Sequence, residues 1–248
     1  MKRDYTRLEE NIRNLKLTFI SDNYKESAVH AAAKSLDHIA YLESLIAGET
    51  ALKQENIIKN RIRNARFPYI KTLEQYNFNH PSKINRMQIE NIFRLDFIEQ
   101  NMNIILLGGC GVGKTHISIA LAQKTCSKGI SVLFSPAVDI INSLSCTSAQ
   151  MNLDKAIKKY TLPKLLVIDE LGYLPIDKLG ANLLFQVISK RYETGSIILT
   201  SNRAFKEWPK IFDNDSTVTS AVLDRLLHHS EVVVIEGKSY RMKDKTEN

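Results

Sequence analysis

A run of closely spaced glycines that ends in a lysine and a threonine carries the clearest chemistry in this sequence. Glycines let the backbone turn tightly enough for its N–H groups to point inward at phosphate oxygens. The lysine would reach the outer phosphates of a nucleotide, and the threonine hydroxyl would bind Mg²⁺. An apolar run precedes the glycines and a helix-forming stretch follows, which is the context that a phosphate-binding loop requires. The loop is Gly108-Gly109-Cys110-Gly111-Val112-Gly113-Lys114-Thr115.

Residues 108–116 are therefore candidates for nucleotide binding, with ATP and Mg²⁺ as the expected cofactors. Cys110 and His116 stand at variable positions of the pattern. We interpret both as filler of the loop and the helix, and not as a nucleophile or a metal ligand. The alternative for the whole stretch is a glycine-rich turn with an incidental Lys-Thr pair.

Two adjacent acids, Asp169 and Glu170, follow the apolar run 165–168. A buried strand would deliver them to the carboxyl edge of a sheet, beside the phosphate-binding loop. There Asp169 could hold Mg²⁺ together with Thr115. Glu170 is placed to polarise an attacking water, which small-molecule kinases do not need, so the pair predicts ATP hydrolysis with Glu170 as a catalytic residue. The alternative is a surface acid at a strand end.

Four later polar residues are weaker candidates. Asn202 follows the apolar run 197–200 and could orient the same water if that strand lies between the first and third strands; turn formation is the alternative. Arg225 is the candidate for an arginine that a neighbouring subunit supplies during phosphoryl transfer; an ion pair or a surface contact is the alternative. Arg241 and Arg203 are further candidates beside the nucleotide, each more typical of a surface.

Five short apolar runs, separated by helical stretches, must position these residues. They are typical of strands buried on both faces, and their alternation with helices predicts a parallel α/β sheet of the P-loop NTPase type. The runs cover residues 104–107, 131–134, 165–168, 197–200 and 232–235. Few residues follow the last run, so we expect no helical lid behind the sheet and a nucleotide pocket that subunit association completes.

The first part of the chain predicts a separate helical module. Apolar residues at helical spacing predict two amphipathic helices over residues 5–46. A turn-rich stretch covers residues 76–82, and another helical pattern covers 83–99. We place the boundary there, with a DNA-binding or partner-binding module over residues 1–75 and an ATPase domain over residues 76–248. The two apolar sets are Leu8, Ile12, Leu15 and Phe19, then Leu36, Ile39, Leu42 and Ile46.

Basic residues gather near the end of this module, where Glu55 is the one acid among them. Such a cluster can contact the phosphates of DNA, or it can be a solvated helix face. The formal net charge of +7 favours the approach of a polyanion without fixing a site. The candidate DNA-binding residues are Lys59, Arg61, Arg63 and Arg66.

Composition limits the compartment. The three cysteines are too few and too irregularly spaced for a zinc cluster or a disulfide framework. The start of the sequence lacks the apolar core of a signal peptide, and no later run approaches the length of a bilayer span. We expect a cytoplasmic protein.

These motifs together resemble the IstB-like ATP-binding proteins, the helper ATPases of bacterial insertion sequences and kin of the replicative helicase loaders. The resemblance extends over nearly the whole chain. Its most specific part is the string Asp169-Glu170-Leu171-Gly172-Tyr173-Leu174-Pro175, beside Lys114-Thr115-His116, Thr200-Ser201-Asn202-Arg203 and Leu223-Asp224-Arg225-Leu226.

The resemblance implies an AAA+ ATPase that forms homo-oligomers on duplex DNA with ATP and recruits the cognate transposase to a target site, in a bacterial, nucleoid-associated setting. The second hypothesis is also an ATPase, but one whose partner is a replicative helicase, which makes the protein a helicase loader. A third hypothesis is a small-molecule kinase, and the presence of Glu170 and Asn202 argues against this function. A non-catalytic nucleotide sensor is the fourth.

Overall fold

The computed structural model of this protein describes residues 5–148 and 152–245. The chain divides into two compact units, Met1–Asn60 and Arg61–Asn248. The division falls inside a long helix, α3 (His38–Ala65).

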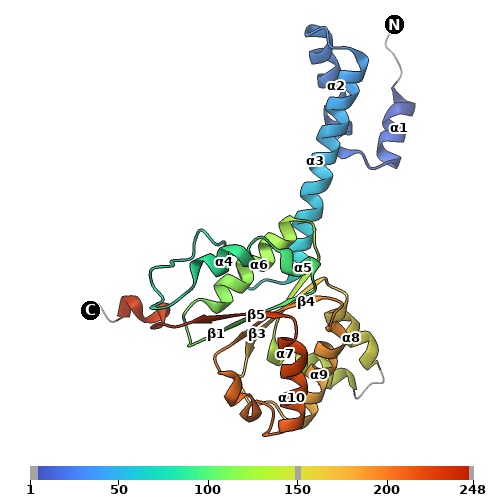
Figure 1. Cartoon of the computed structure of the whole chain (residues 1–248). Coiled ribbons are helices and arrows are strands. Elements are labelled where there is room, and N and C mark those ends of the chain that lie inside the picture. The colour runs from blue at the N-terminus through green and yellow to red at the C-terminus, as the bar shows by residue number, and fades with distance from the viewer. Residues whose placement is uncertain (1–4, 149–151, 246–248) are drawn as a thin grey trace. The chain divides into compact units, whose positions relative to one another are not determined.

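A five-stranded parallel sheet is the centre of the larger unit (Figure 1). The strand order is β2-β3-β4-β1-β5, so the fourth strand lies between the first and the third. Each predicted apolar run overlaps one strand, which confirms the predicted α/β fold. The strands are β1 (Asn103–Gly108), β2 (Val132–Pro136), β3 (Leu165–Leu171), β4 (Ser196–Ser201) and β5 (Ser230–Ile235).

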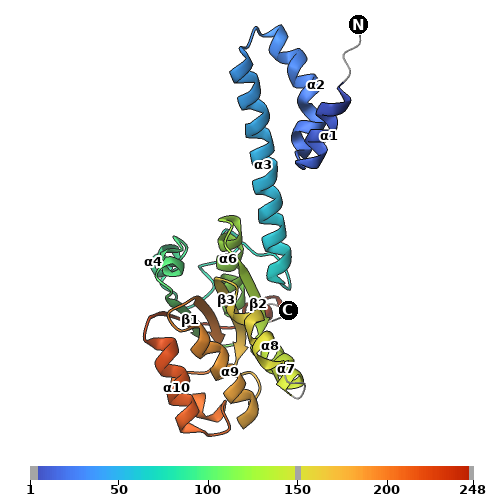
Figure 2. The same ribbon diagram turned by 90° about the vertical axis from the view of Figure 1, so that its right-hand side faces the viewer.

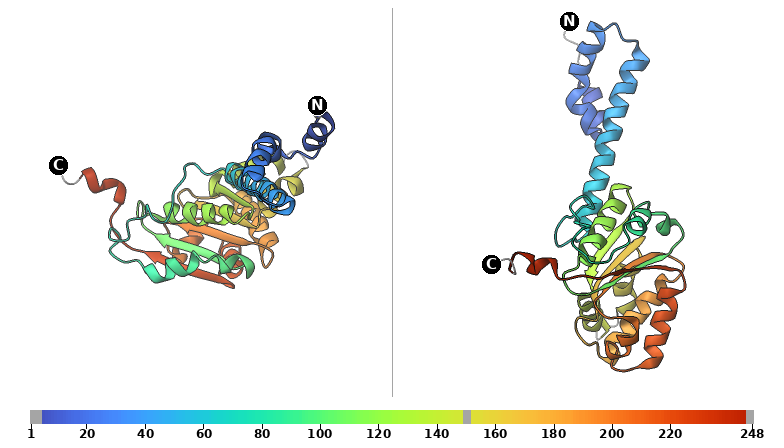
Figure 3. Two further views of the ribbon diagram at one scale, coloured as in Figure 1. Left: turned by 90° about the horizontal axis from the view of Figure 1, so that it is seen from above. Right: turned by 60° about the vertical axis from the view of Figure 1, so that its left-hand side comes forward.

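Helices cover both faces of this sheet (Figures 2 and 3). Ile105 and Leu107 pack into one core cluster, whereas Ile104 and Leu106 pack into the other. Because both faces are buried, the strands read as continuous apolar runs. One face carries α4 (Arg86–Ile92), α5 (Asp96–Glu99) and α6 (Lys114–Ser127); the other carries α7 (Ala137–Ser148), α8 (Leu153–Thr161), α9 (Lys178–Arg191) and α10 (Ser216–Leu227).

The helical pattern predicted over residues 83–99 is two short helices, α4 and α5. Phe93, Leu95 and Phe97 are all buried in the same core cluster. Residues two apart point to nearly opposite sides of a helix, so one continuous helix could not bury all three. The backbone therefore turns at Leu95, whose φ of 71° is left-handed.

Two 3₁₀ segments complete the larger unit, η1 (Phe205–Lys210) and η2 (Tyr240–Lys245). An isolated antiparallel bridge joins Lys83 to Glu236 just after β5. This bridge brings the chain before α4 beside the chain after the last strand.

From Tyr5 onward, where the structure describes the first unit, three helices begin within residues 5–46, where the sequence predicted two. They are α1 (Thr6–Asn14), α2 (Thr18–Ala33) and the part of α3 up to Asn60. A small cluster of Ile12, Ile20, Tyr24 and Leu45 holds them together. The second predicted apolar set, Leu36, Ile39, Leu42 and Ile46, lies around the start of α3. These side chains are largely exposed in this unit, with Ile39 at 79% of its maximal exposure. The helical spacing of apolar residues predicted that this part of the chain is helical. It did not predict which apolar residues pack together.

Residues 61–75 belong to the larger unit, whereas the sequence placed the boundary between residues 75 and 76. The physical reason is apolar burial. Ala65 is fully buried in the core cluster that contains α6, and Ile62, Phe67 and Leu73 pack against the same cluster.

None of the helices in the described chain combines the length and apolar character that a bilayer span requires.

Candidate nucleotide-binding site

The glycine-rich loop joins the carboxyl end of β1 to the first turn of α6. Gly113 caps the helix with a left-handed φ of 98°, and a side chain there would collide with the ring of Tyr76. Gly111 has a φ of 76° and lies against Ser239. The loop geometry thus depends on glycine at two positions, for backbone and for steric reasons. Its backbone is shaped to hold phosphate at the start of α6.

Lys114 folds back over this loop. Its Nζ donates to the carbonyl oxygens of Gly108 and Gly109, each at 2.7 Å. Burial lowers the pKa of the Lys114 ammonium. Among the described residues, the hydrogen bonds of this ammonium go to neutral carbonyls, so the cation can turn to an anionic ligand and the loop fits the phosphates of ATP.

Asp169 is the centre of a hydrogen-bond network at the ends of β3 and β4. The Thr115 hydroxyl lies 3.1 Å from both carboxylate oxygens, and the Thr200 hydroxyl donates to Oδ1 at 2.6 Å. Asp169 is only 4% exposed, and burial raises the pKa of its carboxyl. Thr115 and Asp169, the two predicted magnesium ligands, therefore lie side by side. A hydroxyl and a carboxylate are oxygen donors of the kind that Mg²⁺ prefers, so the donor set fits that ion.

Glu170 has a backbone that an ordinary strand residue does not adopt. Its φ is 60°, and the register of β3 against β4 shifts between Ile168 and Leu171. The Glu170 N–H donates to the Thr200 hydroxyl at 2.9 Å. A left-handed conformation costs a non-glycine residue about 1–2 kcal/mol, and such strain is concentrated at functional sites. The bulge turns the carboxylate out of the sheet, where it lines the same cavity as Lys114.

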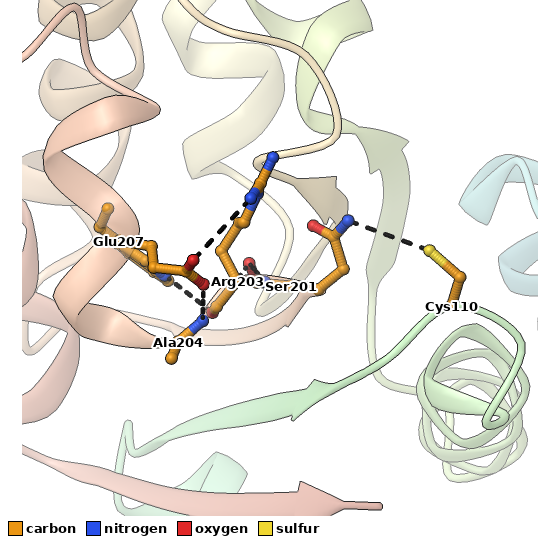
Figure 4. A network of polar contacts seen from close by, with 7 residues as sticks. Cys110, Ser201, Arg203, Ala204 and Glu207 are labelled. Carbon is orange, nitrogen blue, oxygen red and sulfur yellow. Dashed lines mark hydrogen bonds and ion pairs between the residues drawn. The ribbon is translucent and has the colours of Figure 1, made fainter. Parts of the chain in front are cut away.

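Asn202 lies at the tip of β4, between the loop and the acidic pair. Its Nδ2 is 4.0 Å from Cys110 Sγ, a contact drawn in Figure 4. Its Oδ1 is buried and has no hydrogen-bond partner among the described residues. Buried polar atoms are nearly always paired with protein or water, so this oxygen marks a place for a donor.

Lys114, Thr115, Glu170 and Asn202 line one cavity of about 390 Å³, and an aromatic wall lines it as well. His80 and Tyr240 meet edge to face at 4.7 Å between ring centroids. Tyr76 donates its hydroxyl to the Val112 carbonyl at 3.0 Å, and burial raises the pKa of Tyr76 to about 12. Tyr69 is a further member of this wall. Sequence reasoning missed these four residues, although the concentration of aromatic residues in the turn at 76–82 was a usable signal.

His116 and Arg241, two of the predicted nucleotide-binding residues, both line the cavity. His116 Nε2 lies 2.7 Å from the Thr72 carbonyl, and burial lowers the pKa of its imidazole. Its ring packs edge to face on Tyr76. These contacts tie α6 to the segment before α4, which agrees with a packing role for His116.

Arg225 and Arg203 lie outside this cavity. The Arg225 guanidinium stacks over the Phe185 ring at 4.7 Å and lines a different cavity with Asn103, at the opposite edge of the sheet. Within one chain Arg225 cannot serve the nucleotide. Arg203 pairs with Glu207 at 3.9 Å (Figure 4).

The four predicted DNA-binding residues have different surroundings. Lys59 pairs with Glu55 at 2.7 Å in the first unit. Arg63 lies in the last turn of α3. Arg61 and Arg66 line a separate cavity of about 370 Å³ in the larger unit, which Lys159 of α8 also lines.

This arrangement defines a class of protein. A phosphate-binding loop after β1, an acidic pair on β3 and the polar tip of an intervening strand form the site of a P-loop ATPase of the AAA+ class.

The chain belongs to the family of IstB-like ATP binding proteins, whose model matches residues 10–248. An ATP-binding protein of insertion sequence IS21 from Pseudomonas aeruginosa is 37% identical over 238 residues, which cover 96% of this chain and 89% of that protein. An ATP-binding protein of insertion sequence IS232 from Bacillus thuringiensis subsp. berliner is 37% identical over 244 residues, covering 98% and 97%.

Solved structures share the fold of the larger unit. The DnaC helicase loader has a TM-score of 0.53 at 24% identity, covering 71% of this chain and 99% of that chain. DnaI has a TM-score of 0.58 at 14% identity, covering 71% and 93%. AMPPCP-bound DnaA from Aquifex aeolicus has a TM-score of 0.54 at 22% identity; the match covers 71% of this chain and 53%, about half, of that one.

Proposed function

We propose that this protein is a magnesium-dependent transposition ATPase that assembles on duplex DNA and recruits a transposase to target sites. The observation that carries the ATPase chemistry is the convergence of Lys114, Asp169, Glu170 and the unpaired Asn202 oxygen at one sheet edge. The family and its insertion-sequence relatives support the transposition role. The protein would act in the cytoplasm, on the bacterial nucleoid.

The catalytic roles divide among neighbouring side chains. Lys114 leaves its loop carbonyls for the outer phosphates, while Thr115 and Asp169 hold Mg²⁺, which neutralises phosphate charge when bound. Glu170 accepts a proton from the attacking water. Asn202 lines the same cavity as Glu170 and Lys114 and would orient that water. The aromatic wall and Arg241 would flank the rest of the nucleotide.

A basic groove supports DNA binding in the larger unit. Arg61 and Arg66 meet Lys159 around one cavity, together with the polar side chains of Asn64 and Ser131. Within the described chain no carboxylate forms an ion pair with Arg61, Arg66 or Lys159. Cations that converge without acids are suited to the phosphates of a DNA backbone, which carry affinity without reading sequence. Arg63, in the last turn of α3, would extend this surface, whereas Lys59 belongs to the first unit and remains a separate candidate for DNA contact.

Lys159→Ala tests the groove. Each lost phosphate contact should reduce the slope of log K against log salt by about 0.9 for duplex DNA. Lys155→Ala, on the same helix, is the control because Lys155 is exposed and lies outside the groove lining. Equal slopes for both variants and the unmodified protein would place the DNA elsewhere.

The neighbouring subunit would complete the nucleotide pocket. Arg225 cannot reach the pocket of its own chain, so a catalytic role for it requires a second copy. A helicase loader is the second candidate function, and the folds of DnaC and DnaI favour it.

Size-exclusion chromatography with light scattering separates the two functions. The protein is measured with and without a random-sequence duplex of about five helical turns, in ATP and in ADP. Large complexes that need ATP and DNA together are expected for the transposition ATPase. A species that ignores DNA in both nucleotides would contradict it and favour the loader, for which a helicase pull-down follows.

A further inference from the structure

Two histidines and a glutamate form a cluster at the amino edge of the sheet, opposite the nucleotide site. Glu193 lies in the turn after α9, and His228 and His229 join α10 to β5. One donor atom from each lies within 4.8 Å of the other two. All three side chains are exposed. Among the described residues this is the one group of three such donors.

The backbone that carries Glu193 is held in place. Its φ of 59° is left-handed, and the Asn101 amide donates to its carbonyl oxygen at 2.9 Å. Asn101 in turn accepts a hydrogen bond from Lys164 Nζ at 2.7 Å. The turn is therefore fixed from two other segments of the chain, and the carboxylate projects from a defined position.

The histidine backbone is held as well. The Asn103 N–H donates to the His229 carbonyl at 2.7 Å, and the His228 N–H donates to the Asp224 carbonyl at 3.1 Å. The Tyr192 hydroxyl lies 2.9 Å from His228 Nδ1. That bond orients the ring and leaves Nε2 as the nitrogen available to an ion, as outer partners of metal-binding histidines commonly do.

We propose that Glu193, His228 and His229 bind one divalent transition-metal ion, with Zn²⁺ as the preferred ion. Two imidazole nitrogens and one carboxylate are a ligand set that suits Zn²⁺, Co²⁺ and Ni²⁺, whereas Mg²⁺ prefers oxygen donors alone. A tetrahedral ion on three protein ligands keeps one position open for water. The site is separate from the magnesium ligands Thr115 and Asp169, which lie at the carboxyl edge of the sheet.

The ion would link two segments that already touch through the side chains of Tyr192 and His228. It joins the turn before β4 to the turn before β5. Arg225 lines the cavity beside Glu193 and His229, so the ion would restrain the end of α10 that carries this arginine. The Arg225 charge opposes a cation, while the Asp224 and Glu193 carboxylates attract it.

Isothermal titration of the full chain with ZnCl₂, and visible spectra with CoCl₂, test the site. The unmodified protein should bind one equivalent, and His228→Ala/His229→Ala should lose it. His30→Ala/His38→Ala is the matched control, because it removes two exposed imidazoles from the first unit. Glu193→Gln, which keeps both histidines, should weaken binding at least tenfold.

Thermal unfolding provides a second readout. Zn²⁺ at about a hundredfold excess over its Kd should raise the Tm of the unmodified and control proteins by roughly 5–10 °C, and should leave His228→Ala/His229→Ala unshifted. Equal Zn²⁺ binding by that variant and the unmodified protein, or loss of binding in the control variant, would overturn the proposal. Circular dichroism confirms that each variant is folded before titration.

Discussion

The two edges of the sheet pair their buried polar groups differently, although each holds one buried atom with no partner among the described residues, Arg191 Nε at the amino edge and Asn202 Oδ1 at the carboxyl edge. At the amino edge, Arg191 is 1% exposed and donates four hydrogen bonds to backbone carbonyls. Buried Asn103 likewise donates to the Leu226 carbonyl and accepts from the Ile197 N–H. At the carboxyl edge, Asn202 Oδ1 has no partner in the described chain, and Glu170 holds a strained backbone.

The difference shows how one sheet supports both stability and chemistry. Groups that are satisfied inside the chain stabilise the fold and have little capacity left for a ligand. Groups left incomplete cost stability and retain that capacity. Arg191 and Asp169 are both buried, but Arg191 donates to four backbone carbonyls, whereas Asp169 accepts from the side-chain hydroxyls of Thr115 and Thr200.

Glu170→Gln should give the largest effect at the carboxyl edge. Removing a general base lowers turnover by about 10²–10⁴-fold, while Lys114 and the loop still hold ATP. Steady-state ATPase assays together with nucleotide binding measure this. Glu90→Gln is the control, since Glu90 is exposed and pairs with Arg86 on α4. Turnover equal to that of the unmodified protein would refute the water-activating role.

Arg191→Met should give the largest effect at the amino edge. Burial lowers the pKa of Arg191 to about 10, so the side chain stays charged at neutral pH and its four carbonyl partners depend on it. Leaving them without donors should lower the free energy of unfolding by about 3 kcal/mol.

Urea denaturation measures this change, with Lys190→Met as the control on the exposed side of the same helix. Nucleotide affinity should stay the same, because the site lies at the other edge. An unchanged unfolding midpoint would show that the four bonds contribute nothing net.

Asn202→Ala should have a smaller effect, confined to catalysis. One neutral hydrogen bond to the attacking water corresponds to roughly a tenfold fall in kcat, with KM little changed. Asn182→Ala, an exposed position on α9, is the matched control. A raised KM with unchanged kcat would instead assign Asn202 to ground-state nucleotide binding.

Asp169→Asn should give the smallest change in the free energy of unfolding, and this change should be a small increase. Burial raises the pKa of this carboxyl above its value in the unfolded chain, so ionised Asp169 destabilises the fold. This penalty is complete above the folded pKa and disappears as pH falls below the unfolded pKa.

The amide should therefore stabilise the nucleotide-free protein by about 0.5–1 kcal/mol at neutral pH and add nothing in acid. Magnesium-dependent turnover should be lost in the same variant. Denaturation curves at neutral and acid pH test the first point, and a variant less stable than the unmodified protein at neutral pH would contradict it.

The sequence by itself determined the elements whose chemistry is local. The phosphate-binding loop, the strand that ends in Asp169 and the strand before Asn202 depend on residues adjacent in the chain, so pattern and spacing identify them. The Asn202 hypothesis required the fourth strand to lie between the first and the third, and β4 does lie between β1 and β3. The site roles built on these residues stay predictions until the variants are measured.

Only the tertiary structure decided which distant segments meet. Tyr76, His80 and Tyr240 form one wall because an antiparallel bridge at Lys83 brings the chain before α4 beside the chain after β5. Lys159 joins Arg61 and Arg66 across a groove, and Glu193 meets two histidines from another turn. Each meeting depends on packing over long sequence separations, which hydrophobic period and motif spacing do not encode, because they describe only neighbours along the chain.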